Sequence, residues 1–278
     1  MGKYRDAMLM EMRLKGFSPK TVKAYLENVR AFVSYYGKSP VQLGEEEIRG
    51  YLHYLFAQRG SSYSTVNIAY SALRFFYTKT LRREWNVEKI PRPHDRRRLP
   101  TLLDTSEVKR IFEAVPNLKH RTILMTIYSA GLRVSEAVYL KVGDIDSKRM
   151  QIRLDQAKGN KDRYTILSEV LLRVLRHYWR FYQPRYWLFP GRIPDQPISI
   201  SAIQRVFRRA KQDAGIVKSV SVHTLRHSFA THMLELGVDV FCIQKLLGHS
   251  SIKTTRVYIH LQNQGMKQLV NPLDGLVD

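Results

Sequence analysis

A histidine and an arginine lie three residues apart in the segment HTLRHSFATHMLELG, residues 223–237. The pattern of this segment predicts the beginning of a helix, and residues three apart on a helix share one face. His223 and Arg226 can therefore converge on a single ligand.

The same segment also offers the spacing of a metal site. His223 and His227 lie four residues apart, and His232 and His249 are near in the sequence. Zinc sites of that kind normally include a carboxylate or a thiolate, and an arginine on the chelating face would repel the cation. We therefore expect no metal. Histidines satisfied inside a core would explain His227 or His232, but less easily the pair of His223 and Arg226.

A tyrosine follows a second histidine at a distance of nine residues, in the segment LLGHSSIKTTRVYIHL, residues 246–261. Gly248 ends a predicted helix, His249 follows it directly, and a run of small hydroxyl residues leads towards Tyr258. A tyrosine in this setting, taken alone, is more often half-buried packing than a nucleophile. Its role therefore depends on the other motifs.

Four segments together resemble the tyrosine recombinase (phage integrase) superfamily, and most of all its Xer-like and simple integrase members. They are the first arginine box GLRVSEAVYL (131–140), the β-hairpin lysine segment AKGNKDR (157–163), the third box HTLRHSFATHML (223–234) and the segment 246–261. The resemblance covers residues 105–261 in sequence detail. Several separate motifs in the order of the family carry far more weight than any one of them.

The resemblance, carried over position by position, implies a set of catalytic residues in this chain. They are Arg133, Lys158, His223, Arg226, His249 and Tyr258. Glu136, one turn after Arg133, resembles the acidic residue that supports the first arginine of the family. The resemblance implies no cofactor and no metal.

The chemistry that the resemblance implies begins with Tyr258 as a nucleophile that attacks a DNA phosphodiester. The attack places extra negative charge on the non-bridging oxygens, and two guanidiniums, Arg133 and Arg226, bind such oxygens in a fixed geometry that lysine cannot reproduce. His249 would donate a further hydrogen bond to the phosphate. The product is a 3′-phosphotyrosine with a free 5′ hydroxyl, which a second 5′ hydroxyl can reverse without ATP.

Two proton transfers accompany this step. The unperturbed pKa of a tyrosine is about 10, so the neighbouring cations and a basic group such as His223 must help Tyr258 to lose its proton. The leaving 5′ oxygen needs a proton, and Lys158, on or beside a predicted β-turn, is placed to deliver it.

The charge of the chain points to a polyanionic partner. Its 278 residues include 46 Lys and Arg against 24 Asp and Glu, a formal charge of +22. The sequence is 44% hydrophobic, so folded domains carry this charge and not a disordered arm. Charge alone does not separate DNA from RNA, and a ribosome-type RNA-binding protein would have the same balance.

Membrane and secretory signals do not fit the sequence. The apolar run 122–132 is far too short to cross a bilayer, and the first ten residues lack the apolar core and cleavage site of a secretory signal. We therefore expect a cytoplasmic protein with no membrane partner. The single cysteine, Cys242, has no partner for an internal disulfide, and its apolar neighbours predict a buried thiol without a catalytic role.

The residues before the first motif predict a separate helical domain. Apolar positions at spacings of three and four, with glycines 16, 37 and 60 as C-terminal caps, predict four helices near 4–15, 19–36, 45–59 and 63–82. The segment KIPRPHDRRRLP, 89–100, has three prolines and five basic residues, which predicts a basic Pro-rich linker. We expect a core-binding (DNA-binding) domain at 1–88 and a catalytic domain at 101–278.

The expected fold class is mainly α, with a small β-sheet or hairpin in the catalytic domain. Predicted helices at 105–115 and 119–130 and a helix start at Ser135 precede a hairpin whose strands are 150–154 and 163–167. The resemblance adds a DNA-clamp architecture, with a four-helix SAM-like domain before the tyrosine recombinase domain. We expect no arm-binding domain before it, and the 65-residue step from Lys158 to His223 leaves little space for the insertion of integron integrases.

The resemblance also implies partners. These are double-stranded DNA with inverted half-sites and further copies of the chain, with a dimer on each site and a tetramer in the synapse. We expect the tail 265–278 to exchange between protomers. A DNA-binding protein that has lost catalysis and a type IB topoisomerase remain as alternatives, and chromosome-dimer resolution, integration and transposon or plasmid resolution stay open as roles.

Overall fold

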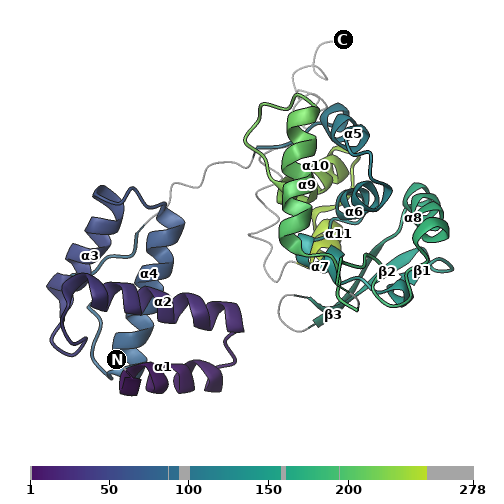
Figure 1. Ribbon diagram of the computed structural model, residues 1–278. Coiled ribbons are helices and arrows are strands. Elements are labelled where there is room, and N and C mark those ends of the chain that lie inside the picture. The colour runs from purple at the N-terminus through teal and green to yellow at the C-terminus, as the bar shows by residue number, and fades with distance from the viewer. Residues whose placement is uncertain (1, 87, 94–100, 158–160, 194, 249–278) are drawn as a thin grey trace, which may run out of the picture. The chain divides into compact units, whose positions relative to one another are not determined.

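The computed structural model describes residues 2–86, 88–93, 101–157, 161–193 and 195–248. The chain divides into two compact units, Met1–Arg98 and Leu99–Asp278, drawn in Figure 1. None of the helices in the described ranges is both long enough and apolar enough to cross a membrane.

The first unit consists of helices. They are α1 (Gly2–Leu14), α2 (Pro19–Tyr36), α3 (Glu45–Ala57), α4 (Tyr63–Phe75) and a five-residue π-helix, η1 (Phe76–Thr80). The hydroxyls of Ser18 and Ser62 each accept a hydrogen bond from a backbone N–H three residues on and so begin α2 and α4. Helices α1 to α4 correspond to the four predicted helices, and η1 continues the fourth.

Aromatic side chains form much of the core of this unit. Phe32, Tyr70 and Phe76 are each at most 1% exposed, and the Tyr77 hydroxyl donates to the carbonyls of Pro40 and Leu43. Ile90, the second residue of the predicted linker, is buried in the same core. The linker expected at 89–100 therefore begins inside the first unit.

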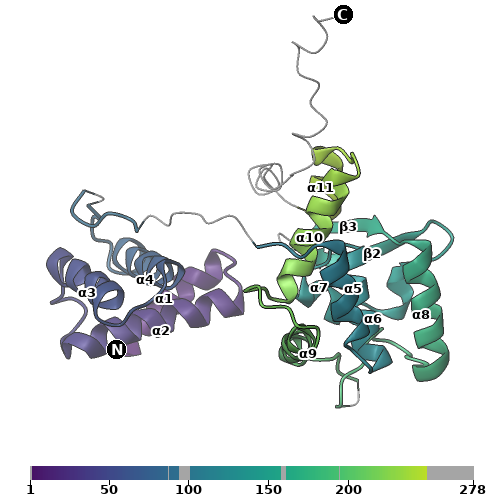
Figure 2. The same ribbon diagram turned by 90° about the horizontal axis from the view of Figure 1, so that it is seen from above.

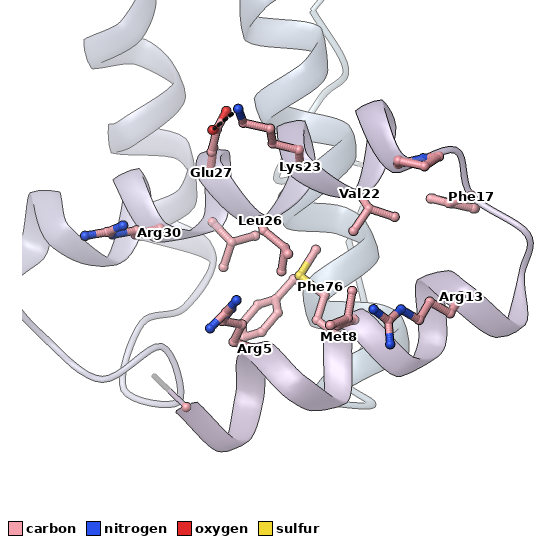
Figure 3. Close-up of a pocket in the computed structure, with 14 residues that line it drawn as sticks. Arg5, Met8, Arg13, Phe17, Val22, Lys23, Leu26, Glu27, Arg30 and Phe76 are labelled. Atoms are coloured by element: carbon pink, nitrogen blue, oxygen red, sulfur yellow. Dashed lines mark ion pairs between the residues drawn. The ribbon is translucent and has the colours of Figure 1, made fainter. Parts of the chain in front are cut away.

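A groove of about 830 Å³ lies between α1 and α2, and Figure 3 shows its lining. Met8, Leu26 and Phe76 contribute apolar surface, while Arg5 and Arg13 extend from α1 beside it. The groove belongs to the first unit alone.

The second unit combines helices with one small sheet. The helices are α5 (Thr105–Glu113), α6 (Leu118–Ser129), α7 (Val134–Val138), the 3₁₀ turn η2 (Val142–Asp144), α8 (Glu169–Tyr182), α9 (Ile200–Asp213), α10 (Val222–Glu235) and α11 (Val240–Leu247). The strands β1 (Ile145–Asp146), β2 (Gln151–Ala157) and β3 (Lys161–Ile166) are antiparallel in the order β1-β2-β3. The mainly α fold with a small hairpin is confirmed.

Helix α6 is central to this unit (Figure 2), because it contacts α5, α7, α8, α9 and α10. Its residues Ile123, Leu124 and Ile127 are fully buried. Helix α11 packs on α10 and β3 through Ile243 and Leu247. Cys242 is exposed, so the prediction of a buried thiol is wrong. In the helix, only some residues of the apolar run face the core, and the neighbour Ile243 is one that is buried there.

Candidate active site

A tight turn places Arg133 at the beginning of α7. Gly131 has a φ of +62°, and a Cβ at this position would lie 2.6 Å from the Phe229 ring of α10, so the turn requires a glycine. Two residues on, the backbone N–H of Arg133 donates to Oε2 of Glu136 at 2.8 Å, and the Arg133 side chain donates to Oε1. Glu136 thus fixes both the helix start and the guanidinium of Arg133.

Arg226, on α10, is the most deeply buried charge among the described residues, at 1% exposure. Its Nη1 donates to the Gly131 carbonyl at 2.8 Å, and its Nη2 donates to the Leu247 carbonyl at 2.6 Å. Its Nη1 also lies 3.4 Å from Oε2 of Glu136. The arginine therefore joins the turn before α7 to the end of α11.

A third arginine, Arg163 on β3, meets the same carboxylate. Its two terminal nitrogens donate to the two oxygens of Glu136, each at 2.8 Å, and its Nε donates to the Leu246 carbonyl at 3.1 Å. Arg163 is the last residue of the segment 157–163, and its spacing in the sequence predicts no role for it. Strand alternation would have found it, because Arg163 shares a face with the buried residues Thr165 and Leu167.

We call Arg133, Glu136, Arg163 and Arg226 the arginine cluster. Burial alone would raise the pKa of Glu136, but hydrogen bonds and charge from Arg163, followed by Arg133, lower it to about 2. One carboxylate faces three guanidiniums, so the cluster keeps an excess of positive charge. Such a site favours an anion with several oxygens.

His223 lies one helical turn before Arg226 and reaches the surface. Desolvation of the ring by the surrounding protein lowers the pKa of His223, and the charges of Arg226 and Arg133 lower it further. The charge of Glu136 opposes this shift. His223 is therefore mainly neutral at pH 7, and a neutral imidazole can accept a proton.

The two neighbouring histidines occupy other environments. The His227 ring lies 4.7 Å from that of His223, and burial first, then His223 and Arg226, lower the pKa of His227 to about 4. The Nδ1 atom of His232 is hydrogen-bonded to the Tyr128 hydroxyl at 2.9 Å. Within the described ranges, His, Cys, Asp and Glu side chains form no group that could hold a metal ion.

The structure thus brings together Arg133, Glu136, His223 and Arg226 from the predicted set. Lys158, His249 and Tyr258 lie outside the described residues. The chain segments beside two of them are described: β2 and β3 pair as far as Ala157 and Lys161, and α11 ends at Gly248 with a φ of +62°.

The sequence of the chain is similar to those of known proteins. Residues 101–265 match the model of the phage integrase family, and residues 4–87 match that of the phage integrase N-terminal SAM-like domain. A putative integrase/recombinase of Sinorhizobium fredii, y4qK, is 43% identical over 98% of this chain and 89% of its own length. A tyrosine recombinase of Pseudothermotoga lettingae is 33% identical over 94% of both chains.

The fold also agrees with solved structures. A lambda integrase tetramer bound to a Holliday junction superposes with a TM-score of 0.76, at 18% identity, over 92% of this chain and 76% of the other. The chain belongs to the phage integrase family. It is a site-specific DNA recombinase of the tyrosine type, and phosphotyrosyl chemistry is typical of this family.

Proposed function

We propose that six residues of this recombinase carry out DNA cleavage and joining: Arg133, Lys158, His223, Arg226, His249 and Tyr258. The observation that supports the proposal best is the arginine cluster, in which Arg133 and Arg226 share one carboxylate, Glu136. Two guanidiniums held in this way provide fixed positive charge where a phosphodiester gains negative charge, and they need no rearrangement during the reaction.

In the proposed mechanism, Tyr258 attacks the phosphorus and forms the 3′-phosphotyrosine while the bond to the 5′ oxygen breaks. The proton of the tyrosine passes to His223, whose lowered pKa keeps the imidazole neutral and ready to accept it. Lys158 gives a proton to the leaving 5′ oxygen, and His249 donates a hydrogen bond to a non-bridging oxygen. Attack by a 5′ hydroxyl from a second duplex reverses each transfer and seals a new junction.

The proposed partners are double-stranded DNA with inverted half-sites and other copies of the chain. The formal charge of +22 supports a polyanionic partner, and lambda integrase has been solved as a tetramer on a Holliday junction. We assign residues 1–88 to a core-binding domain, 89–100 to a linker and 101–278 to the catalytic domain. The enzyme works in the cytoplasm, where its DNA is found.

The proposal is tested with a supercoiled plasmid that carries two copies of the target site. The sequence of this site is first found from DNA that is covalently trapped on the protein in cells. Wild-type protein should yield recombined circles, while Tyr258→Phe should bind the sites with a normal affinity and form neither adduct nor product, because only the attacking oxygen is missing. Relaxed plasmid without recombinants would instead indicate the activity of a type IB topoisomerase. Recombinants from Tyr258→Phe would overturn the assignment of the nucleophile.

A further inference from the structure

Arg163 uses its whole guanidinium within the protein. Both terminal nitrogens donate to the Glu136 carboxylate, and Nε donates to Leu246. The Arg163 and Glu136 side chains are each 10% exposed. The pair has the parallel two-bond geometry that makes an arginine–carboxylate contact directional as well as strong.

The partners of Arg163 belong to the segments that carry the proposed catalytic residues. Glu136 contacts both Arg133 and Arg226. Leu246 lies at the end of α11, two residues before Gly248, and the next carbonyl, that of Leu247, accepts from Arg226. Arg163 itself follows the β2–β3 connection that contains Lys158.

The end of α11 is fitted closely around this side chain. A Cβ on Gly248 would lie 2.7 Å from Cδ and 2.9 Å from Nε of Arg163. The last carbonyls of a helix carry partial negative charge, so guanidiniums there are stabilising as well as position-fixing. Arg163 and Arg226 thus bind successive carbonyls at the end of α11, directly before Gly248.

We propose that Arg163 is a positioning residue of the recombinase, which acts on the scissile phosphate through Glu136 by holding the carboxylate that orients Arg133 and Arg226. The inference rests on the proposed function of those two arginines. A lysine at this position would keep the charge but would make a single-point contact, so it would leave the carboxylate free to turn.

Two other roles of Arg163 predict different results from a positioning role. A salt bridge that only stabilises the fold would, when broken, lower the melting temperature and leave the reaction of the remaining folded molecules unchanged. A residue that contacts DNA directly would, when lost, weaken binding. A residue that acts through Glu136 should lose its effect once the carboxylate is removed, which a double-mutant cycle measures.

The cycle compares wild-type protein, Arg163→Met, Glu136→Gln and the double variant on a nicked duplex that carries the recovered site and traps the cleaved complex. Single-turnover cleavage at saturating protein and the Kd for the duplex are measured separately, below the melting temperature of every variant. Arg153→Met is the matched control, because Arg153 is an ion-paired arginine on the neighbouring strand that is 48% exposed and bonded to Asp155.

We expect Arg163→Met and Glu136→Gln each to slow cleavage by about 100-fold, with Kd nearly unchanged, because small displacements of the charge-stabilising groups have effects of this size. In the Glu136→Gln background, loss of Arg163 should change the rate by less than about threefold. Arg163→Lys should remain well below wild type, and Arg153→Met should cleave at the wild-type rate. If Arg163→Met melts below the assay temperature, Arg163→Lys takes its place in the same cycle.

Rate losses that multiply in the double variant, or a weaker Kd with an unchanged cleavage rate, would overturn the inference about Arg163. The proposed function would stand in that case, provided that the wild-type protein forms its Tyr258-dependent adduct. An adduct that persists in Tyr258→Phe would overturn the proposed function and the inference with it.

Discussion

At the scale of single residues, Glu136 determines how the positive charge of the site is arranged. It binds Arg133, Arg163 and Arg226 with one carboxylate, and the pKa of that carboxylate is held at about 2. The guanidiniums are therefore pre-oriented before DNA binds. The pKa of His223 beside them is lowered, as the proposed role of proton acceptor requires.

The depressed pKa of Glu136 has a consequence for acid stability. A carboxyl whose pKa is lower in the folded state contributes stability that is present above its unfolded pKa, about 4.3, and is lost as the pH falls through the folded value. Glu136→Gln should therefore reduce the free energy of unfolding by about 3 kcal/mol near pH 7, because it leaves buried guanidiniums unpaired. Denaturant unfolding of both proteins between pH 7 and pH 2 should show this gap closing below pH 4, towards the folded pKa of about 2. A gap that stays constant with pH would contradict an ionised Glu136.

The role of Lys158 is tested by changing the leaving group. Lys158→Ala should cleave normal DNA poorly but should regain most of its rate on a duplex with a 5′-bridging phosphorothiolate, because sulfur leaves without a proton. Cleavage rates are measured on both duplexes, with His223→Ala as the comparison that should gain nothing from the sulfur. Equal losses of Lys158→Ala on the two duplexes would remove Lys158 from the role of general acid.

At the scale of secondary-structure elements, the turn after α6 and the end of α11 provide the backbone carbonyls that hold the arginine cluster. Gly131 turns the chain between α6 and α7, and Gly248 ends α11, both with positive φ. The carbonyls exposed at these ends, those of Gly131, Leu246 and Leu247, accept hydrogen bonds from Arg226 and Arg163. Helices α6 and α11 both pack against α10, which brings these two ends together.

Gly248→Ala tests this arrangement. Alanine is strained at a φ of +62°, and its methyl group would displace the Arg163 side chain, so both stability and the cleavage rate should fall. The matched control is Gly215→Ala, where φ is +66° and the added methyl group meets no atom within 4 Å. The control should lose about 1 kcal/mol of unfolding free energy and keep its cleavage rate. Equal cleavage by the two folded variants would show that the contact between Gly248 and Arg163 does not matter for the site.

Capping residues and the alternation of apolar residues in the sequence predict well where several helices and strands begin. Ser18 with Pro19 begins α2, Asp104 begins α5 through a capping box, and the alternation in RYTIL predicts β3. The π-helix after Phe75 could not be predicted, since it depends on the hydrogen bond from Leu81 N–H to the Phe76 carbonyl within a packed core. The contact between Arg163 and Glu136 joins residues 27 apart, and spacing along the chain does not determine such a contact.

At the scale of the whole molecule, two units and a positive charge of +22 suit an enzyme that acts on DNA. Recombination between two duplexes needs more than one active site. We therefore expect contacts between copies of the chain to coordinate cleavage at these sites. The segment 265–278 lies outside the described residues, but its sequence places Met266, Leu269 and Val270 at helical spacing before Pro272. Such an apolar stripe needs a pocket, and we expect a neighbouring protomer to supply it.

Truncation after Asn263 tests the exchange between protomers. The shortened protein should keep its melting temperature and its affinity for a single half-site, while cooperative binding to the full site and recombination fall sharply. Mobility shifts on half-sites and full sites, together with the plasmid assay, separate these quantities. Unchanged recombination would make the tail dispensable, and unfolding would place it in the core of its own domain.

The central claim, that Tyr258 forms the bond to DNA, is tested most directly by finding the modified residue. The trapped covalent complex is digested with nuclease and then with trypsin, which releases residues 257–267, VYIHLQNQGMK, after Arg256. Mass spectrometry should find the remaining nucleotide on this peptide, with fragment ions that place it on Tyr258. A nucleotide on any other peptide, with 257–267 recovered unmodified, would contradict the account.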